Sequence, residues 1–165
     1  MLHTYNLFSI SVFQGKIIVP LETHKKILNY VEKNYEEKDL YSCVDGFQYH
    51  GDFSGKKELD KLINHQMSTI YQLKILNGWL NVLTNKSYNK PHYHAGNDIR
   101  ASGVMYLSSQ NNNINFVRDA QSDVFEIRPK LFDYLVFPFN LLHYVLPEDR
   151  KEYRICYAFN LKPLK

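Results

Sequence analysis

Cysteine is scarce in this 165-residue chain, which contains only two, Cys43 and Cys156. Two cysteines make neither a disulfide framework nor a zinc knuckle. Long apolar runs are also absent, since none approaches the ~20 residues that cross a bilayer. The first residues lack the basic segment and apolar stretch of a secretory signal. We therefore expect a cytoplasmic protein with no membrane partner.

An excess of charge of one sign is missing as well. The 20 Lys and Arg residues nearly balance 17 Asp and Glu residues, leaving a formal net charge of +3. This net charge is small and the lysines are scattered along the chain, which argues against nucleic acid as a partner. The length suits one domain, so we expect residues 1–165 to form a single unit. Nothing in the sequence indicates its oligomeric state.

Aromatic residues, in contrast, are abundant at 15% of the chain and favour β structure. Helical periodicity is confined to residues 21–35 and 57–71. The segment 43–54, which contains Gly46, Gly51 and several aromatic residues, is interpreted as a loop. Short apolar runs between turn-forming residues predict the remaining elements as strands. These are residues 73–75, 78–83, 91–94, 101–107, 114–117, 124–128, 134–137, 142–145 and 153–161, with 7–13 and 16–19 near the amino end. The pattern predicts a mainly β member of the α+β class, with helical support over about 21–71 and a barrel core over about 73–161.

Three of the seven histidines are candidate metal ligands. His92 and His94 are two residues apart, so in a strand both rings would project from one face. On spacing alone, a surface pair without a ligand is the commoner arrangement. His143 lies in an apolar run, where an unpartnered imidazole is costly to bury. Three such ligands on Fe(II) would leave cis positions open for a chelating co-substrate and O2.

Arg154 is the candidate anion-binding residue. Alternation along the last predicted strand places Arg154, Cys156, Ala158 and Asn160 on one face, and bulky apolar residues on the other. Small side chains beside an arginine leave room for a carboxylate, which a guanidinium can hold with two hydrogen bonds. A turn centred between Glu148 and Asp149 predicts a hairpin with His143 directly opposite Arg154.

In this order and spacing, the segments resemble the Fe(II)- and 2-oxoglutarate-dependent dioxygenases, especially small bacterial and phage proteins related to prolyl hydroxylases. The resemblance rests on Trp79-Leu80-Asn81, Pro91-His92-Tyr93-His94, Ser102-Gly103-Val104-Met105-Tyr106-Leu107, Leu135-Val136-Phe137-Pro138, His143-Tyr144-Val145-Leu146-Pro147 and Arg154-Ile155-Cys156 with Phe159-Asn160. It implies a double-stranded β-helix, which is a jelly-roll or cupin-like barrel, with two or more helices packed on one sheet.

The resemblance also implies roles for individual residues. His92 and His143 match iron ligands, while His94 stands where the superfamily usually has a carboxylate. Arg154 and Tyr106 match residues that hold the distal carboxylate of 2-oxoglutarate. Asn81 and, more weakly, Asn160 match amides that help to hold this co-substrate.

Two departures from the family pattern leave alternatives open. Asp98 could supply the carboxylate in place of His94 if its loop folds back. Cys156 stands where a hydroxyl group is often found.

The implied reaction hydroxylates an unidentified protein side chain or small molecule while 2-oxoglutarate is decarboxylated to succinate. Arg100, Arg118 and Asp119 are either contacts for that substrate or ordinary surface charges. One rival is a cupin-like three-histidine dioxygenase that does not use 2-oxoglutarate, in which Arg154 would bind the carboxylate of the substrate. The other is a non-enzymatic jelly-roll module whose histidines are structural.

Overall fold

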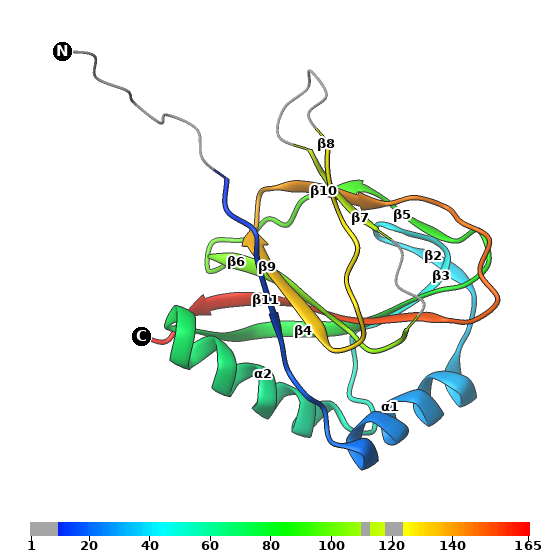
Figure 1. The fold of residues 1–165 in the computed structure, drawn as a ribbon, viewed down its shortest axis with the longest axis horizontal. Coiled ribbons are helices and arrows are strands. Elements are labelled where there is room, and N and C mark those ends of the chain that lie inside the picture. The colour runs from blue at the N-terminus through cyan, green and yellow to red at the C-terminus, as the bar shows by residue number, and fades with distance from the viewer. Residues whose placement is uncertain (1–9, 110–112, 118–123) are drawn as a thin grey trace.

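Antiparallel strands with two helices along one side make up the part of the chain that the computed structural model describes, residues 10–109, 113–117 and 124–165 (Figure 1). The helices α1 (Leu21–Asn34) and α2 (Lys56–Tyr71) nearly match the predicted ranges. Neither has the length and apolar character needed to span a membrane. The strands are β1 (Phe13–Lys16), β2 (Lys38–Leu40), β3 (Cys43–Tyr49), β4 (Leu73–Leu83), β5 (Tyr88–His92), β6 (Ala101–Tyr106), β7 (Ile114–Val117), β8 (Val124–Ile127), β9 (Asp133–Pro138), β10 (Leu142–Val145) and β11 (Arg154–Pro163).

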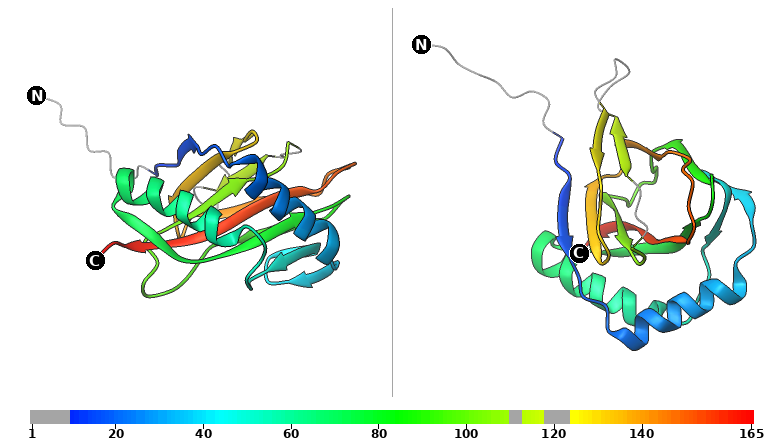
Figure 2. Two further views of the ribbon diagram at one scale, coloured as in Figure 1. Left: turned by 90° about the horizontal axis from the view of Figure 1, so that it is seen from below. Right: turned by 45° about the vertical axis from the view of Figure 1, so that its right-hand side comes forward.

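Strand β3 joins two antiparallel sheets into one curled sheet. The first sheet has the order β1-β9-β6-β11-β4-β3, and the second continues as β3-β5-β10-β7-β8, with β2 paired to β3. The right-hand view of Figure 2 looks into the curl, with both helices outside it. This arrangement confirms the predicted mainly β class and is the architecture of a double-stranded β-helix.

The outer face of the first sheet packs against the two helices. Ile27 and Val31 of α1 and Leu59, Ile63 and Met67 of α2 are fully buried in one cluster. The same cluster contains four residues of β11, Ile155, Tyr157, Phe159 and Leu161. Alternation along β11 therefore holds as predicted, and its other face, which begins with Arg154, points into the curl.

The loop predicted over residues 43–54 is wrong for its first part, which forms β3. Gly46 suggested a turn, but it lies in the middle of the strand. A Cβ atom at Gly46 would lie 2.5 Å from Cys43 Sγ and 2.8 Å from the carbonyl oxygen of Val82. The glycine therefore reflects a close approach to the neighbouring strand β4.

Two further strand predictions need correction near the first sheet. Residues 73–75 and 78–83 belong to one strand, β4, because Gly78 accommodates the Tyr157 side chain instead of forming a turn. At the amino end, residues 7–9 lie outside the described part of the chain. The strand there is Phe13–Lys16, so it overlaps the predicted strand 7–13 at Phe13 alone and the predicted strand 16–19 at Lys16 alone, and residues 10–12 are not part of a strand.

The predicted hairpin between β10 and β11 is also wrong. Strand β10 pairs with β5 and β7, whereas β11 pairs with β4 and β6. The connection between β10 and β11 therefore crosses from one sheet to the other. Its buried Arg150 donates hydrogen bonds to the carbonyl oxygens of Thr84 (2.8 Å) and Ser87 (2.7 Å), which fixes the crossing against the β4–β5 loop.

Candidate active site

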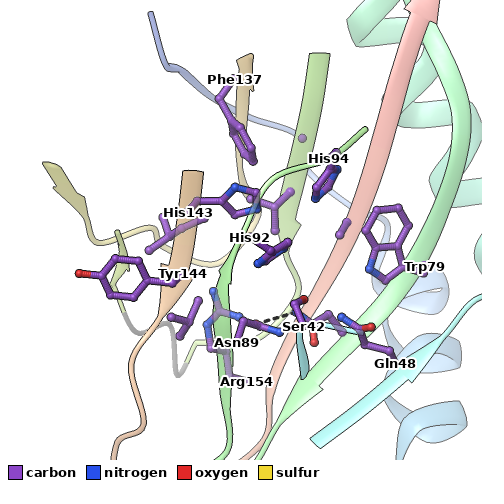
Figure 3. Close-up of a pocket in the computed structure, with 16 residues that line it drawn as sticks. Ser42, Gln48, Trp79, Asn89, His92, His94, Phe137, His143, Tyr144 and Arg154 are labelled. Carbon is purple, nitrogen blue, oxygen red and sulfur yellow. Dashed lines mark hydrogen bonds between the residues drawn. The ribbon is translucent and has the colours of Figure 1, made fainter. Parts of the chain in front are cut away.

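Three histidine rings face one another between the two sheets (Figure 3). His143 of β10 lies directly opposite His92 of β5, instead of opposite Arg154. His94 lies beyond the end of β5, so the predicted strand 91–94 ends too late, but its backbone N–H still donates to the Phe139 carbonyl oxygen at 2.7 Å. One ring nitrogen from each of the three histidines can be chosen so that all three nitrogens lie within 4.8 Å of one another.

Hydrogen bonds to the backbone fix the orientation of two of these rings. His92 Nδ1 lies 2.7 Å from the Lys90 carbonyl oxygen, and His143 Nδ1 lies 2.8 Å from the Leu141 carbonyl oxygen. Because a carbonyl oxygen only accepts, each Nδ1 carries the proton. The lone pair of each Nε2 is then free to bind a metal.

Side chains from the first sheet fix the third ring, His94. Its Nδ1 lies 2.5 Å from Asn160 Oδ1 and 2.8 Å from Ser102 Oγ. Ser102 Oγ donates to Asn160 Oδ1 at 2.9 Å, and Asn160 Nδ2 donates to Asn77 Oδ1 at 3.0 Å. Asn77, Asn160 and Ser102 are paired in register across β4, β11 and β6, so the sheet itself builds this polar row.

Burial keeps the three imidazoles neutral. Desolvation is the main cause that lowers the pKa of each ring, and it brings the pKa of His143 to about 3 with smaller contributions from His92 and His94. Neutral imidazoles with a fixed tautomer are the form that binds a transition metal, so the donor set fits Fe(II). Asp98 is exposed and does not belong to the metal-ligand cluster. Among the described residues, that cluster consists of the three histidines alone.

A small cavity of about 40 Å³ reaches from the histidines to Arg154. Arg154 is only 1% exposed, and within the described part of the chain no carboxylate forms an ion pair with it. Its Nε has no hydrogen-bond partner, and its Cζ lies 5.3 Å from the centroid of the Tyr106 ring. A buried guanidinium without a counter-charge is costly, so this end of the cavity favours an anionic ligand.

Amide side chains along the same cavity also have unpartnered polar atoms. Asn81 Nδ2 donates to Asn89 Oδ1 at 2.9 Å, which leaves Asn81 Oδ1 and Asn89 Nδ2 without partners. Gln48 Oε1 is buried and unpartnered as well. Native proteins rarely bury such groups unless a ligand or water meets them, so the cavity is suited to a polar molecule.

The other predicted site residues are placed differently. Tyr106 is fully buried beside Arg154 and outside the cavity lining; its hydroxyl is unpartnered and burial raises its pKa. Arg100 is exposed and does not line the cavity, nor does it line a larger open groove next to the cavity. Arg118 and Asp119 lie outside the described residues.

Sequence reasoning missed Gln48, Asn89 and Ser102 as parts of the site. Gln48 was missed because residues 43–49 were interpreted as a loop. Had they been treated as a strand, alternation around the buried Phe47 would have pointed Gln48 toward the opposite face. Asn89 and Ser102 acquire their roles from strand pairing, which no local pattern reveals.

No protein family model matches the sequence, and no curated protein matches it either. Solved structures do share its fold. AviO1 from Streptomyces viridochromogenes Tue57 is 10% identical, with 93% of this chain and 90% of that one covered and a TM-score of 0.72. A Pseudomonas putida prolyl-4-hydroxylase is 12% identical, with 94% of each chain covered and a TM-score of 0.68.

A third similar structure is HygX from Streptomyces hygroscopicus, with nickel, 2-oxoglutarate and hygromycin B bound. It is 12% identical, with 93% of this chain and 83% of that one covered and a TM-score of 0.64. Such low identities establish the fold alone. The chain has the fold of prolyl-4-hydroxylases and 2-oxoglutarate-Fe(II) oxygenases, which confirms the resemblance at that level.

Proposed function

We propose that this protein is an Fe(II)- and 2-oxoglutarate-dependent oxygenase that hydroxylates its substrate. The observation that supports this most strongly is the pairing of two features across one small cavity. Three neutral imidazoles with free Nε2 atoms lie at one end, and the unpaired guanidinium of Arg154 lies at the other. A ligand with a metal-chelating end and a distal carboxylate, such as 2-oxoglutarate, matches both ends.

Each residue has a distinct task in this proposal. Iron(II), when bound with 2-oxoglutarate and O2, supplies the oxidising chemistry that hydroxylates carbon and yields succinate. His92, His94 and His143 would hold the metal, and Arg154, beside Tyr106, would hold the distal carboxylate. The amides of Asn81 and Asn89 offer the remaining hydrogen bonds. Because three neutral ligands leave the full charge on the metal, the site favours anionic chelators.

Apolar side chains complete the cavity between the metal ligands and Arg154. Val104, Ile114, Phe137 and Val145 line it beside the polar groups. These residues would restrict water around the bound co-substrate, which strengthens the interaction of its carboxylate with Arg154.

Two structures of similar fold contain ligands that bear on the proposal. HygX holds nickel, 2-oxoglutarate and hygromycin B, and a Trichoplax adhaerens prolyl hydroxylase holds a peptide fragment of a hypoxia inducible factor. One protein of this fold therefore holds a small molecule and another holds a peptide, so the substrate of this protein has to be sought on its own surface beside the histidines.

Anaerobic titration with Fe(II), with and without 2-oxoglutarate, tests the proposal. We expect a visible charge-transfer band only when both are present, because the band reports chelation of the metal by the keto acid. His143→Ala should abolish iron uptake, whereas loss of a merely structural histidine would leave the metal stoichiometry intact. Absence of iron uptake by the wild-type protein would favour a non-enzymatic module.

The three-histidine donor set also favours a second candidate, a dioxygenase that does not use 2-oxoglutarate. In that case Arg154 would bind the carboxylate of the substrate itself. Once the substrate is identified, succinate release separates the two candidates. Release of one succinate per turnover supports the first, and turnover without succinate supports the second.

A further inference from the structure

An open groove of about 720 Å³ begins where the inner cavity ends. His92 and His94 line both spaces, as do Ser42, Gln48 and Trp79. A molecule in the groove therefore lies directly beside the histidines, on the side away from Arg154. If the inner cavity holds the co-substrate, the groove is the place for the substrate.

Aromatic rings form one wall of this groove. The ring of Tyr41 lies 5.1 Å from that of His50, His50 stacks on Trp79 at 5.2 Å, and Trp79 lies 5.6 Å from His94. The wall thus leads from Tyr41, which is 78% exposed, to a member of the histidine cluster. Exposed aromatic rings in a groove provide a surface on which the face of another ring can stack.

The groove carries almost no charge. Among the described residues that line it, Lys90 is the only lysine or arginine, and none is acidic. Partial desolvation lowers the pKa of His50, so this ring adds no charge at neutral pH. A polyanion would call for several cations along its path, and a polyamine would call for carboxylates. The lining instead suits an uncharged ligand.

Gln48 indicates what that ligand carries. Its side chain is buried, with the residue 6% exposed, and its Oε1 lacks a partner at the junction of groove and cavity. A ring that bears hydroxyl groups could both donate to and accept from this amide, whichever way the amide is turned. A prolyl ring itself has neither an N–H nor an O–H to offer, so a prolyl peptide could donate to Gln48 only through a neighbouring residue.

We propose that the groove binds an uncharged, hydroxyl-bearing ring of the sugar type. The ring would pack against the aromatic wall that Tyr41, His50 and Trp79 form, and a hydroxyl group would meet Gln48 beside the histidines. This inference rests on the proposed function, because the groove is a substrate site only if the neighbouring cluster holds the catalytic metal.

The chain offers a built-in probe for this site, since Trp79 is its only tryptophan. Metal-free protein is titrated with neutral methyl pyranosides of glucose, galactose, mannose and N-acetylglucosamine. Trp79 fluorescence and ligand-observed NMR saturation transfer report binding. N-acetylproline dimethylamide, glucose 6-phosphate and glucosamine serve as donor-free, anionic and cationic comparisons. We expect at least one methyl pyranoside to bind about tenfold more tightly than all three comparisons.

Gln48→Met should weaken binding of that pyranoside roughly three- to tenfold, because one hydrogen bond is lost while the side-chain volume is kept. Gln66→Met, on α2 outside the groove, provides the matched control and should change nothing.

Equal or tighter binding of the prolyl amide, no effect of Gln48→Met, or no binding of any pyranoside would each overturn the inference. If the charge-transfer band forms with Fe(II) and 2-oxoglutarate but no pyranoside binds, the proposed function is kept and the sugar site is rejected. Pyranoside binding without metal uptake would reject the proposed function and keep the groove as a sugar site.

Discussion

At the scale of single residues, His94 differs from the other two histidines in how its ring is held. Backbone carbonyl oxygens near in sequence hold His92 and His143, whereas Asn160 and Ser102 hold His94 from another sheet. The residue that replaces the usual carboxylate thus depends on distant side chains. Asn160, predicted to contact the co-substrate, contacts His94 in the structure, which suggests that its effect would be on the metal.

Removing these partners should weaken metal binding. We predict that Asn160→Ala and Ser102→Ala each lower Co(II) affinity by about 10- to 100-fold, because the His94 ring loses its fixed tautomer and orientation. Asn160→Asp should restore most of the affinity, since a carboxylate also accepts from Nδ1. Competition with a chromophoric chelator measures the change, and Asn34→Ala at the exposed end of α1 is the control. An Asn160→Ala protein with normal metal affinity and weakened 2-oxoglutarate binding would instead assign Asn160 to the co-substrate.

Arg154 should act on the co-substrate and not on the metal. We predict that Arg154→Leu weakens 2-oxoglutarate binding to the Fe(II) protein by about 30-fold or more, because a buried carboxylate loses its charged partner. The iron stoichiometry should stay unchanged. The concentration dependence of the charge-transfer band measures both quantities, with exposed Arg128→Leu as the control. Unchanged co-substrate affinity would remove Arg154 from the site.

Burial of His143 should make the metal-free protein sensitive to acid. Its pKa is about 3 in the folded protein against an ordinary 6.5, so only the unfolded chain gains this proton as the pH falls from 6.5 toward 3. The contribution to stability is therefore fully present above pH 6.5 and decreases below it. When the pH is lowered from 7.5 to 5, the unfolding free energy of the wild type should fall by about 2 kcal/mol more than that of His143→Gln. Urea denaturation of metal-free protein checks this, and parallel losses in both proteins would refute it.

At the scale of elements, helices and strands were predicted correctly where the contacts that stabilise them lie close together in the sequence. The helices α1 and α2 were predicted closely because their apolar stripes lie within their own sequences. Strands β3 and β4 were predicted wrongly at Gly46 and Gly78. At both positions a side chain or carbonyl oxygen of another strand lies where a Cβ atom would be, so only glycine fits. A single sequence shows the glycine but not the atom that approaches it.

Gly46→Ala tests the most consequential of these contacts, in the strand shared by both sheets. The new Cβ would meet the backbone carbonyl oxygen of Val82 at 2.8 Å, and backbone cannot move aside without disturbing β3–β4 pairing. We predict a loss of about 1–3 kcal/mol in unfolding free energy, measured by chemical denaturation. Gly96→Ala is the control, because its close neighbour at 2.9 Å is the end of the flexible Ile99 side chain. Equal effects of the two substitutions would show that the Val82 contact does not matter.

At the scale of the whole molecule, the candidate site is a product of sheet topology. The sequence identified His92, His94, His143 and Arg154, but it placed His143 opposite Arg154 through a hairpin that does not exist. In the structure the pairing of β5 with β10 brings two histidines together, and Arg154 reaches the same cavity from the facing sheet. The right residues were found because polar groups stood out in apolar strands, while their partners depended on long-range register.

The side chains common to the inner cavity and the groove have a thermodynamic consequence. Ser42, Gln48 and Trp79 border both spaces, so two ligands bound side by side would share the same wall. If either ligand shifts these side chains, the affinity of the other must change, and the factor is necessarily the same in both directions. Such a coupling would need shifts of these shared side chains alone, because they already contact both compartments.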